Sequence, residues 1–152
     1  MAEGRIESPE PLSGRLRLEM APRLLELGKL LGRVDAFGVE MGFSPEDAYR
    51  VVLVLDELIT NIIVHGVEAS EVRHIVVDLH YRQPDLEMEI SDPGRPFDPR
   101  AVSPPDTDKG IAERKIGGLG IHVVRTLVDS IDYRYDAGRN VVTLVKRLSR
   151  AG

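Results

Sequence analysis

The spacing of apolar residues changes along the chain between a period of about two, typical of strands, and a period of about 3.6, typical of helices. Residues 15–19 alternate polar and apolar side chains, which predicts a half-exposed strand. Over residues 23–41 the apolar side chains recur at helical spacing and Gly42 follows as a stop signal, so we expect a first helix there. Ser44, followed by proline, is a strong N-cap for a second helix that we expect to run to about residue 66.

The second half of the chain shows strand patterns separated by a long loop and a third helix. Strand signals over residues 74–82 and 85–91 flank a Gln-Pro pair, which indicates a hairpin. Residues 93–116 contain five of the ten prolines, and a structureless loop of this length in a compact domain is usually functional. The remaining expected elements are a helix from the glycines at 117–120 to about residue 130, and strands over 131–135 and 140–146 around a turn at 136–138.

The order of these elements predicts an α+β fold. We expect a two-layer sandwich in which three helices cover one face of a mixed, mostly antiparallel sheet. Residues 1–11 carry three Glu and two Pro and few apolar side chains, so they are predicted to be a flexible leader. Residues 12–149 are then expected to form a single domain.

The composition excludes several functional classes. The chain has 152 residues, enough to bury a real core, and no run of about 18 apolar residues that could span a membrane. It has no cysteine, which excludes thiol catalysis and cysteine metal sites. The formal net charge of −5 argues against nucleic acid as the main partner. Because the start of the chain lacks the apolar core of a signal peptide, we expect a cytoplasmic protein.

The second helix carries the first candidate site. Glu57, Asn61 and His65 follow one another at i, i+4 spacing, which places them on one face of the helix. A carboxylate one turn from an amide can position a proton acceptor beside an oxygen ligand for Mg²⁺. The alternative is a solvated polar stripe, because Asp56 and Thr60 widen the polar strip, and for an isolated strip that alternative is favoured.

Two further motifs lie in the second half of the chain. Asp92 ends a strand and Gly94 follows it, a pair that can hydrogen-bond a ligand donor and admit a planar ring, or can form a plain Asp-Pro-Gly turn. Gly118, Leu119 and Gly120 open the third helix, where free N–H groups and the helix dipole suit phosphate oxygens. The alternative there is a hinge between loop and helix, so neither motif decides the function alone.

The order and spacing of the three motifs together resemble the GHKL (Bergerat-fold) ATPase superfamily, over roughly residues 16–148. The stretch from Glu57 to Gly66 looks most like the bacterial anti-sigma-factor serine/threonine kinases. A sensor histidine kinase would carry an upstream phosphoaccepting helix, whereas all four histidines here fall inside the predicted domain.

The resemblance assigns roles to individual residues. It implies that Glu57 is the base that activates the acceptor hydroxyl, that Asn61 holds Mg²⁺ against the phosphates, and that Asp92 binds the adenine amino group. The other nucleotide-binding residues that it implies are Gly94 beside the ring, Gly118, Leu119 and Gly120 in the phosphate turn, the lid cations Lys109, Arg114 and Lys115, and Thr143 in the last strand. The family often has a threonine after the last hairpin glycine, where this chain has Arg139, so Thr143 is the weakest of these assignments.

The implied function is an ATP-dependent serine/threonine protein kinase and anti-sigma factor. It would use ATP/ADP and Mg²⁺, phosphorylate an anti-anti-sigma protein of the STAS type, and sequester a sigma factor. A nucleotide-responsive binding module with little kinase activity, or a detached sensor-histidine-kinase ATP domain, are the alternatives. The sequence leaves open whether two copies form a homodimer.

Overall fold

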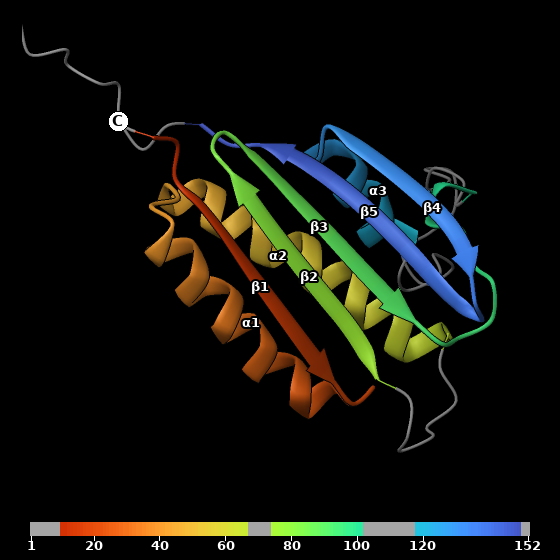
Figure 1. Ribbon diagram of the computed structural model, residues 1–152. Coiled ribbons are helices and arrows are strands. Elements are labelled where there is room, and N and C mark those ends of the chain that lie inside the picture. Colours follow the sequence, from red (N-terminus) through yellow and green to blue (C-terminus); the bar gives the residue numbers. More distant parts are fainter. Residues whose placement is uncertain (1–9, 67–73, 102–117, 150–152) are drawn as a thin grey trace, which may run out of the picture.

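The sheet is antiparallel throughout, with strand order β1-β2-β3-β5-β4 (Figure 1). The computed structural model describes residues 10–66, 74–101 and 118–149, and in these residues three α helices lie on one face of the five strands. The elements are β1 (Ser13–Met20), α1 (Leu24–Glu40), α2 (Pro45–Asn61), η1 (Ile62–Gly66), β2 (Ile75–Arg82), β3 (Asp85–Asp92), η2 (Pro99–Ala101), α3 (Gly118–Leu127), β4 (Ser130–Asp136) and β5 (Arg139–Arg147). This confirms the predicted α+β two-layer fold, although the sheet has no parallel pair of strands among the described residues. Residues 1–9 of the predicted leader lie outside the described residues.

The start of α2 forms as its sequence predicts. Ser44 is the N-cap, and its Oγ accepts a hydrogen bond of 3.1 Å from the backbone N–H of Asp47. Pro45 occupies the first helical position, where its missing N–H costs nothing. In the short connection between α1 and α2, Gly42 has a φ of +75°, a conformation that glycine adopts readily and that ends α1.

The end of α2 differs from the prediction in its winding. The helix predicted to reach residue 66 does so, but from Ile62 onward it is a π-helix. Such π turns are rare and frequently occur at functional sites. Since the change in winding begins directly after Asn61, it lies beside one of the predicted site residues.

The core lies between α2 and the inner face of the sheet. Val54, Leu55 and Ile59 of α2 are fully buried. The sheet meets them with alternate residues of its three central strands, which are Ile75, Val77, Leu79 and Tyr81 of β2, Leu86, Met88 and Ile90 of β3, and Val142 and Leu144 of β5. None of the described helices is long and apolar enough to cross a membrane.

The third helix is tied to the sheet at its C-terminal end. Lys146 of β5 is 8% exposed, and its Nζ donates a 2.7 Å hydrogen bond to the carbonyl oxygen of Leu127. A cation at this end also interacts favourably with the helix dipole. The sheet therefore fixes one end of α3, while the other end begins with the glycines of the predicted phosphate turn.

A buried carboxylate joins the start of α2 to the end of the described chain. Asp47 is 3% exposed, and its Oδ2 accepts hydrogen bonds from the backbone N–H (2.9 Å) and the hydroxyl (2.8 Å) of Ser149. Asp47→Ala leaves these donors unpaired, so we expect a loss of about 1–3 kcal/mol in the free energy of unfolding, measured with urea. Glu46→Ala is the matched control, since its side chain in the same turn is 83% exposed and a change within about 0.5 kcal/mol is expected. Equal losses in the two variants would contradict the role of Asp47.

Candidate functional site

A pocket of about 240 Å³ lies where the end of α2, the end of β3, the start of β5, the loop after β3 and the start of α3 come together. Its walls are largely apolar with a few polar groups, which is the usual character of a small-molecule site. The lining residues are Leu58, Asn61, Ile62, Ile90, Asp92, Arg95, Pro96, Phe97, Pro99, Ile121, Asn140 and Val142. The pocket therefore joins two of the predicted site residues, Asn61 and Asp92, across 31 positions of sequence.

Asp92 is the buried acid of the pocket, 5% exposed at the end of β3. Its Oδ1 accepts hydrogen bonds from the backbone N–H of Gly94 (2.9 Å) and from Nδ2 of Asn140 (3.1 Å). Its Oδ2 accepts none from the part of the chain that the structure describes. Burial raises the pKa of the Asp92 carboxyl above its ordinary value, against the lowering effects of these two hydrogen bonds and of Arg139. As far as the described residues go, one carboxylate oxygen is thus left for a ligand donor.

Gly94 contributes to the site by donating its backbone N–H to Asp92. The hydrogen bond between them is the Asp-Pro-Gly turn that the sequence offered as an alternative to a ligand site. The turn uses only one oxygen of Asp92, so the two interpretations are compatible. Gly94 itself is not among the lining residues of the pocket.

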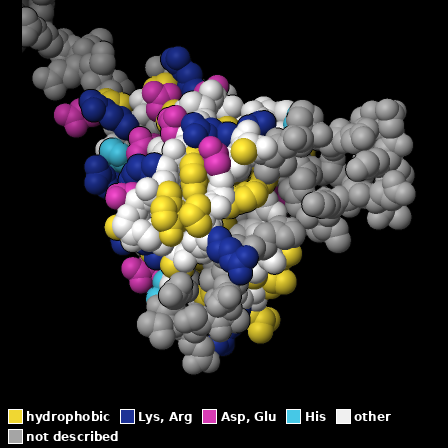
Figure 2. Space-filling view, turned by 90° about the vertical axis from the view of Figure 1, so that its right-hand side faces the viewer, with side chains coloured by type: hydrophobic (Ala, Val, Ile, Leu, Met, Phe, Trp, Pro, Cys, Tyr) yellow, Lys and Arg dark blue, Asp and Glu magenta, His cyan; other side chains and the backbone are white. Residues whose placement is uncertain are grey.

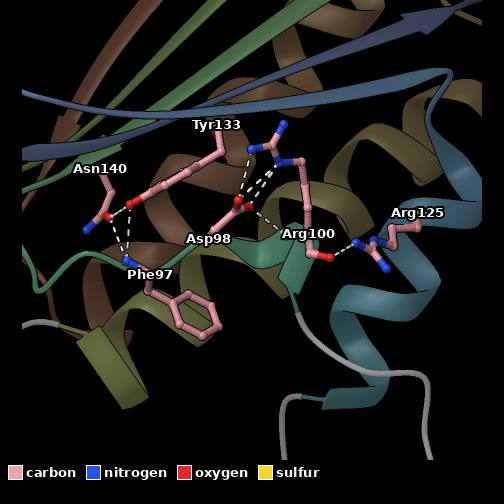
Figure 3. Close-up of polar contacts among 6 residues, drawn as sticks. All are labelled: Phe97, Asp98, Arg100, Arg125, Tyr133 and Asn140. Carbon is pink, nitrogen blue, oxygen red and sulfur yellow. Dashed lines mark hydrogen bonds and ion pairs between the residues drawn. The ribbon is translucent and has the colours of Figure 1, made fainter.

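Asn140 of β5 is the polar residue that sequence reasoning missed. It is 3% exposed and lies opposite Asp92 in the register of β3 and β5. Its Oδ1 accepts hydrogen bonds from the hydroxyl of Tyr133 (2.5 Å) and the backbone N–H of Phe97 (2.9 Å), as Figure 3 shows. The signal in the sequence was a polar residue in phase with the inward-facing Val142 and Leu144 of the same strand.

The structure does not bring Thr143 to the pocket. Thr143 lies between Val142 and Leu144, which face the helices, so its side chain is on the opposite face of the sheet. Thr143 is not among the lining residues of the pocket, so the pocket gives its assignment as a nucleotide contact no support and that assignment stays a prediction; Asn140 is the polar residue of β5 that lines the pocket.

Glu57 lies beside the pocket, next to the first turn of α3. It is half-buried on α2, one turn before Asn61. A Cβ on Gly120 would overlap Oε2 of Glu57 and would lie 3.1 Å from its Cδ. The absent side chain of Gly120 therefore lets the Glu57 carboxylate approach the start of α3. Gly118 and Leu119 begin that helix as predicted, whereas Lys109, Arg114 and Lys115 lie outside the described residues.

The close approach of Glu57 to Gly120 can be measured by substitution. We expect Gly120→Ala to destabilise the protein by up to about 1 kcal/mol in urea unfolding, because the new methyl group overlaps the Glu57 carboxylate and this flexible side chain can turn away at a small cost. In a Glu57→Ala background the same change should be neutral or stabilising by up to about 1 kcal/mol, because alanine forms helices better than glycine. Gly28→Ala on α1 is the control, since a Cβ there meets nothing within 4 Å. An unchanged cost in the two backgrounds would contradict the contact.

The loop wall of the pocket is fixed at two points. Phe97 donates its backbone N–H to Asn140 and to the hydroxyl of Tyr133 (3.1 Å), and the carbonyl oxygen of Arg100 accepts a hydrogen bond from Arg125 of α3 (Figure 3). Between these points Asp98 forms a 2.9 Å ion pair with Arg100, and the hydrogen bond from Arg100 lowers the pKa of Asp98. The wall is thereby attached both to the sheet and to the third helix.

Apolar side chains reach the surface on this side of the molecule. Figure 2 shows the face on the right-hand side of Figure 1, where hydrophobic side chains gather in the middle and acidic and basic side chains lie above them and to the left. Among the large apolar residues in this part of the chain, Phe97 of the pocket wall is 51% exposed and Tyr135 of β4 is 48% exposed. The pocket wall therefore presents an aromatic ring to solvent at its edge.

No cluster of three or more histidine, aspartate or glutamate side chains that could hold a metal occurs among the described residues. Such a cluster is not required for Mg²⁺ that arrives with a nucleotide, because the phosphates supply ligands and the ion keeps several waters. Asn61, an oxygen donor at the pocket, fits this limited role.

Residues 20–146 match the family described as Histidine kinase-like ATPase domain. Among curated proteins, the serine-protein kinase RsbW of Listeria innocua serovar 6a is 30% identical over 131 residues, which are 84% of this chain and 82% of that protein. RsbW of Listeria monocytogenes serovar 1/2a is also 30% identical over 131 residues, which are again 84% of this chain and 82% of that protein. The solved RsbU and RsbW domains of Rv1364c from Mycobacterium tuberculosis superpose with a TM-score of 0.66 at 18% identity. That likeness, which concerns the fold alone, covers 91% of this chain and 34% of the longer chain.

Proposed function

This chain belongs to the histidine kinase-like ATPase domain family, and from that premise we propose that it binds ATP with Mg²⁺ and transfers the γ-phosphate to a serine of an anti-anti-sigma protein. Its relatives over 84% of its length are serine-protein kinases, which places it in the protein serine/threonine kinase class. In the proposal the acceptor is a protein of the STAS type. The unphosphorylated acceptor competes with a sigma factor for this chain, which holds the sigma factor inactive.

The observation that carries the proposal is the burial of Asp92 and the use of only one of its carboxylate oxygens within the described residues. A buried carboxylate with one oxygen unsatisfied within the described residues is costly unless a ligand donor pairs with it. An exocyclic amino group of adenine supplies such a donor, and the apolar walls of Ile90, Ile121 and Val142 suit a planar ring. The sugar and phosphates would then extend toward Asn61 and the start of α3.

The remaining roles follow from the order of residues along α2. Asn61 would hold Mg²⁺, which neutralises charge on the phosphates when bound. Gly118 and Gly120 begin α3, whose first N–H groups have no helical partner and would bind phosphate oxygens. Glu57 lies against Gly120 and would take the proton from the incoming serine hydroxyl. Each of these assignments is a proposal for this chain.

Phosphotransfer to a purified partner tests the proposal. The full chain would be incubated with Mg-ATP and STAS-type proteins encoded near its gene, and phosphoserine would be sought by mass spectrometry. The proposal predicts phosphoserine on one of them and loss of sigma-factor binding when the unphosphorylated partner is added. Nucleotide binding without transfer to any partner would favour a nucleotide-responsive binding module, and phosphohistidine would favour a detached sensor-kinase domain.

A further inference from the structure

We propose that Asn140, supported by Tyr133, is the positioning residue that orients Asp92 and thereby sets the preference of the pocket for a base that carries an amino group. This inference rests on the proposed nucleotide function and adds to it a residue and a source of specificity. It begins from the hydrogen bonds of the Asn140 amide, which are all made within the protein.

The orientation of the Asn140 amide is fixed by its partners. The backbone N–H of Phe97 can only donate, so the atom that it meets at 2.9 Å must be the amide oxygen. The amide nitrogen then faces acceptors only, which are Oδ1 of Asp92 (3.1 Å) and the carbonyl oxygens of Gly94 (3.3 Å) and Arg95 (2.8 Å). A flipped amide would set donor against donor on one side and acceptor against acceptor on the other.

The amide of Asn140 is therefore fully used. Its oxygen accepts two hydrogen bonds, from Phe97 and from the hydroxyl of Tyr133, and its two N–H donors are shared among three acceptors. Although Asn140 lines the pocket, it has no donor or acceptor left for a ligand. Its effect on a ligand must pass through the groups that it holds.

The most important of those groups is Asp92. Asn140 and Gly94 both donate to Oδ1, so they choose which carboxylate oxygen is used by the protein and which is left for the ligand. The same amide holds the carbonyl of Arg95 and the N–H of Phe97, two residues of the loop wall of the pocket. One side chain thus contacts both the acceptor and this wall.

This arrangement discriminates by chemistry at one position of the base. The remaining oxygen of Asp92 accepts a hydrogen bond from an amino group, is left unpaired by a base with hydrogen there, and repels a carbonyl oxygen. A site built to pair with one polar group discriminates well only while the acceptor is held in place. Without Asn140 the carboxylate can rotate, and water can enter the space of the amide and solvate it.

The test uses a pair of nucleotides that differ only in the amino group, ADP and purine riboside 5′-diphosphate, with affinities measured by calorimetry. For the wild-type chain we expect ADP to bind about 10- to 100-fold more tightly. In Asn140→Ala we expect this ratio to fall at least about fivefold, while the affinity for purine riboside 5′-diphosphate changes by less than about threefold. A merely structural role would weaken both nucleotides alike and leave the ratio unchanged, which would overturn the inference.

A second pair of variants keeps the test decisive if Asn140→Ala does not fold. Tyr133→Phe removes one hydroxyl that donates to Asn140, so the ratio should fall by about two- to threefold. Tyr135→Phe is the matched control two residues along β4, because its hydroxyl makes no hydrogen bond within the described residues and its ring is 48% exposed. Equal ratios in these two variants would overturn the inference. A wild-type chain that binds neither nucleotide would overturn the proposed function, and this inference with it.

Discussion

Glu57→Gln is expected to reduce phosphotransfer at least about a hundredfold while ATP affinity stays the same or improves slightly. Removal of a general base costs about 10²–10⁴ in rate, or roughly 3–5 kcal/mol of barrier. Binding should not suffer, because the glutamine keeps the shape of the side chain and removes the repulsion between a carboxylate and the phosphates. Single-turnover phosphotransfer and calorimetry on the same preparation separate the two effects.

Two variants on the same helix serve as controls for Glu57. Asp56→Asn alters the neighbouring carboxylate, whose Oδ1 accepts a 3.3 Å hydrogen bond from Thr60, and should leave the transfer rate within about threefold. Asn61→Ala should instead lose Mg²⁺-dependent binding and transfer together. If the Glu57→Gln protein phosphorylates its partner at the wild-type rate, the assignment of Glu57 as the base is wrong.

The second large effect is expected for Asp92→Asn, which should weaken ADP binding by about 30-fold or more. The asparagine oxygen can still accept from Gly94 and Asn140, so its amide N–H₂ takes the place of the free carboxylate oxygen. The amide N–H₂ then faces the amino group of the base, so donor meets donor. The hydrogen bond is lost and both groups stay unpaired, which costs about 2–4 kcal/mol of binding free energy. Calorimetry with ADP and with purine riboside 5′-diphosphate should show the loss for ADP alone.

The same carboxylate predicts a pH dependence of binding. The pKa of Asp92 is raised, chiefly by burial, and only the ionised group accepts the hydrogen bond without first losing a proton. ADP affinity of the wild type should therefore fall as the pH drops through that raised pKa. The positive charge of Arg139 lowers the pKa of Asp92 and so partly offsets the effect of burial. Asp92→Asn should show no such fall, and comparison with it removes the titration of the ligand itself. A parallel fall in the two proteins would contradict the role of Asp92.

The raised pKa also has a consequence for stability without ligand. The unfolded chain loses this proton near the ordinary pKa of 3.8, whereas the folded chain holds it to higher pH. The contribution of Asp92 to the free energy of unfolding is therefore present below 3.8 and is lost as the pH rises through the raised pKa. At neutral pH the ligand-free Asp92→Asn protein should be at least as stable as the wild type in urea, which distinguishes lost binding from misfolding.

The sequence predicted the fold well because its elements are marked locally. Ser44 and Pro45 are an N-cap and a first-turn proline, and the structure uses them as such. The strands predicted over residues 74–82 and 85–91 correspond to β2 and β3, where alternation of buried and exposed side chains reports directly on one covered face. The π winding after Asn61 has no such local mark, since it depends on how the end of α2 meets its neighbours.

The site was predictable only where a motif lies within one segment. Asp92 and Gly94 are two positions apart and form their turn locally. Asn140 of β5 acts on Asp92 directly, and Tyr133 of β4 acts through Asn140, so both contacts depend on how β5 pairs with β3 and with β4. Thr143 and Asn140 differ by an odd number of positions, so one of them had to face away from the pocket. The resemblance implies a threonine near the base, whereas the register places Asn140 at the pocket.

Because Asp92 pairs with Asn140 in the sheet, nucleotide binding and the docking of the last hairpin depend on one another. The two residues are 48 positions apart, so the base pocket is complete only after the hairpin of β4 and β5 has docked on β3. A nucleotide bound as proposed would then act as a latch on that hairpin, adding about 2.7 kcal/mol to the docked state at a concentration a hundredfold above its dissociation constant. If the hairpin undocks, β3 becomes an open edge that can pair with other chains. Bound nucleotide would thus make undocking of this hairpin rarer, independently of whether the protein transfers a phosphate.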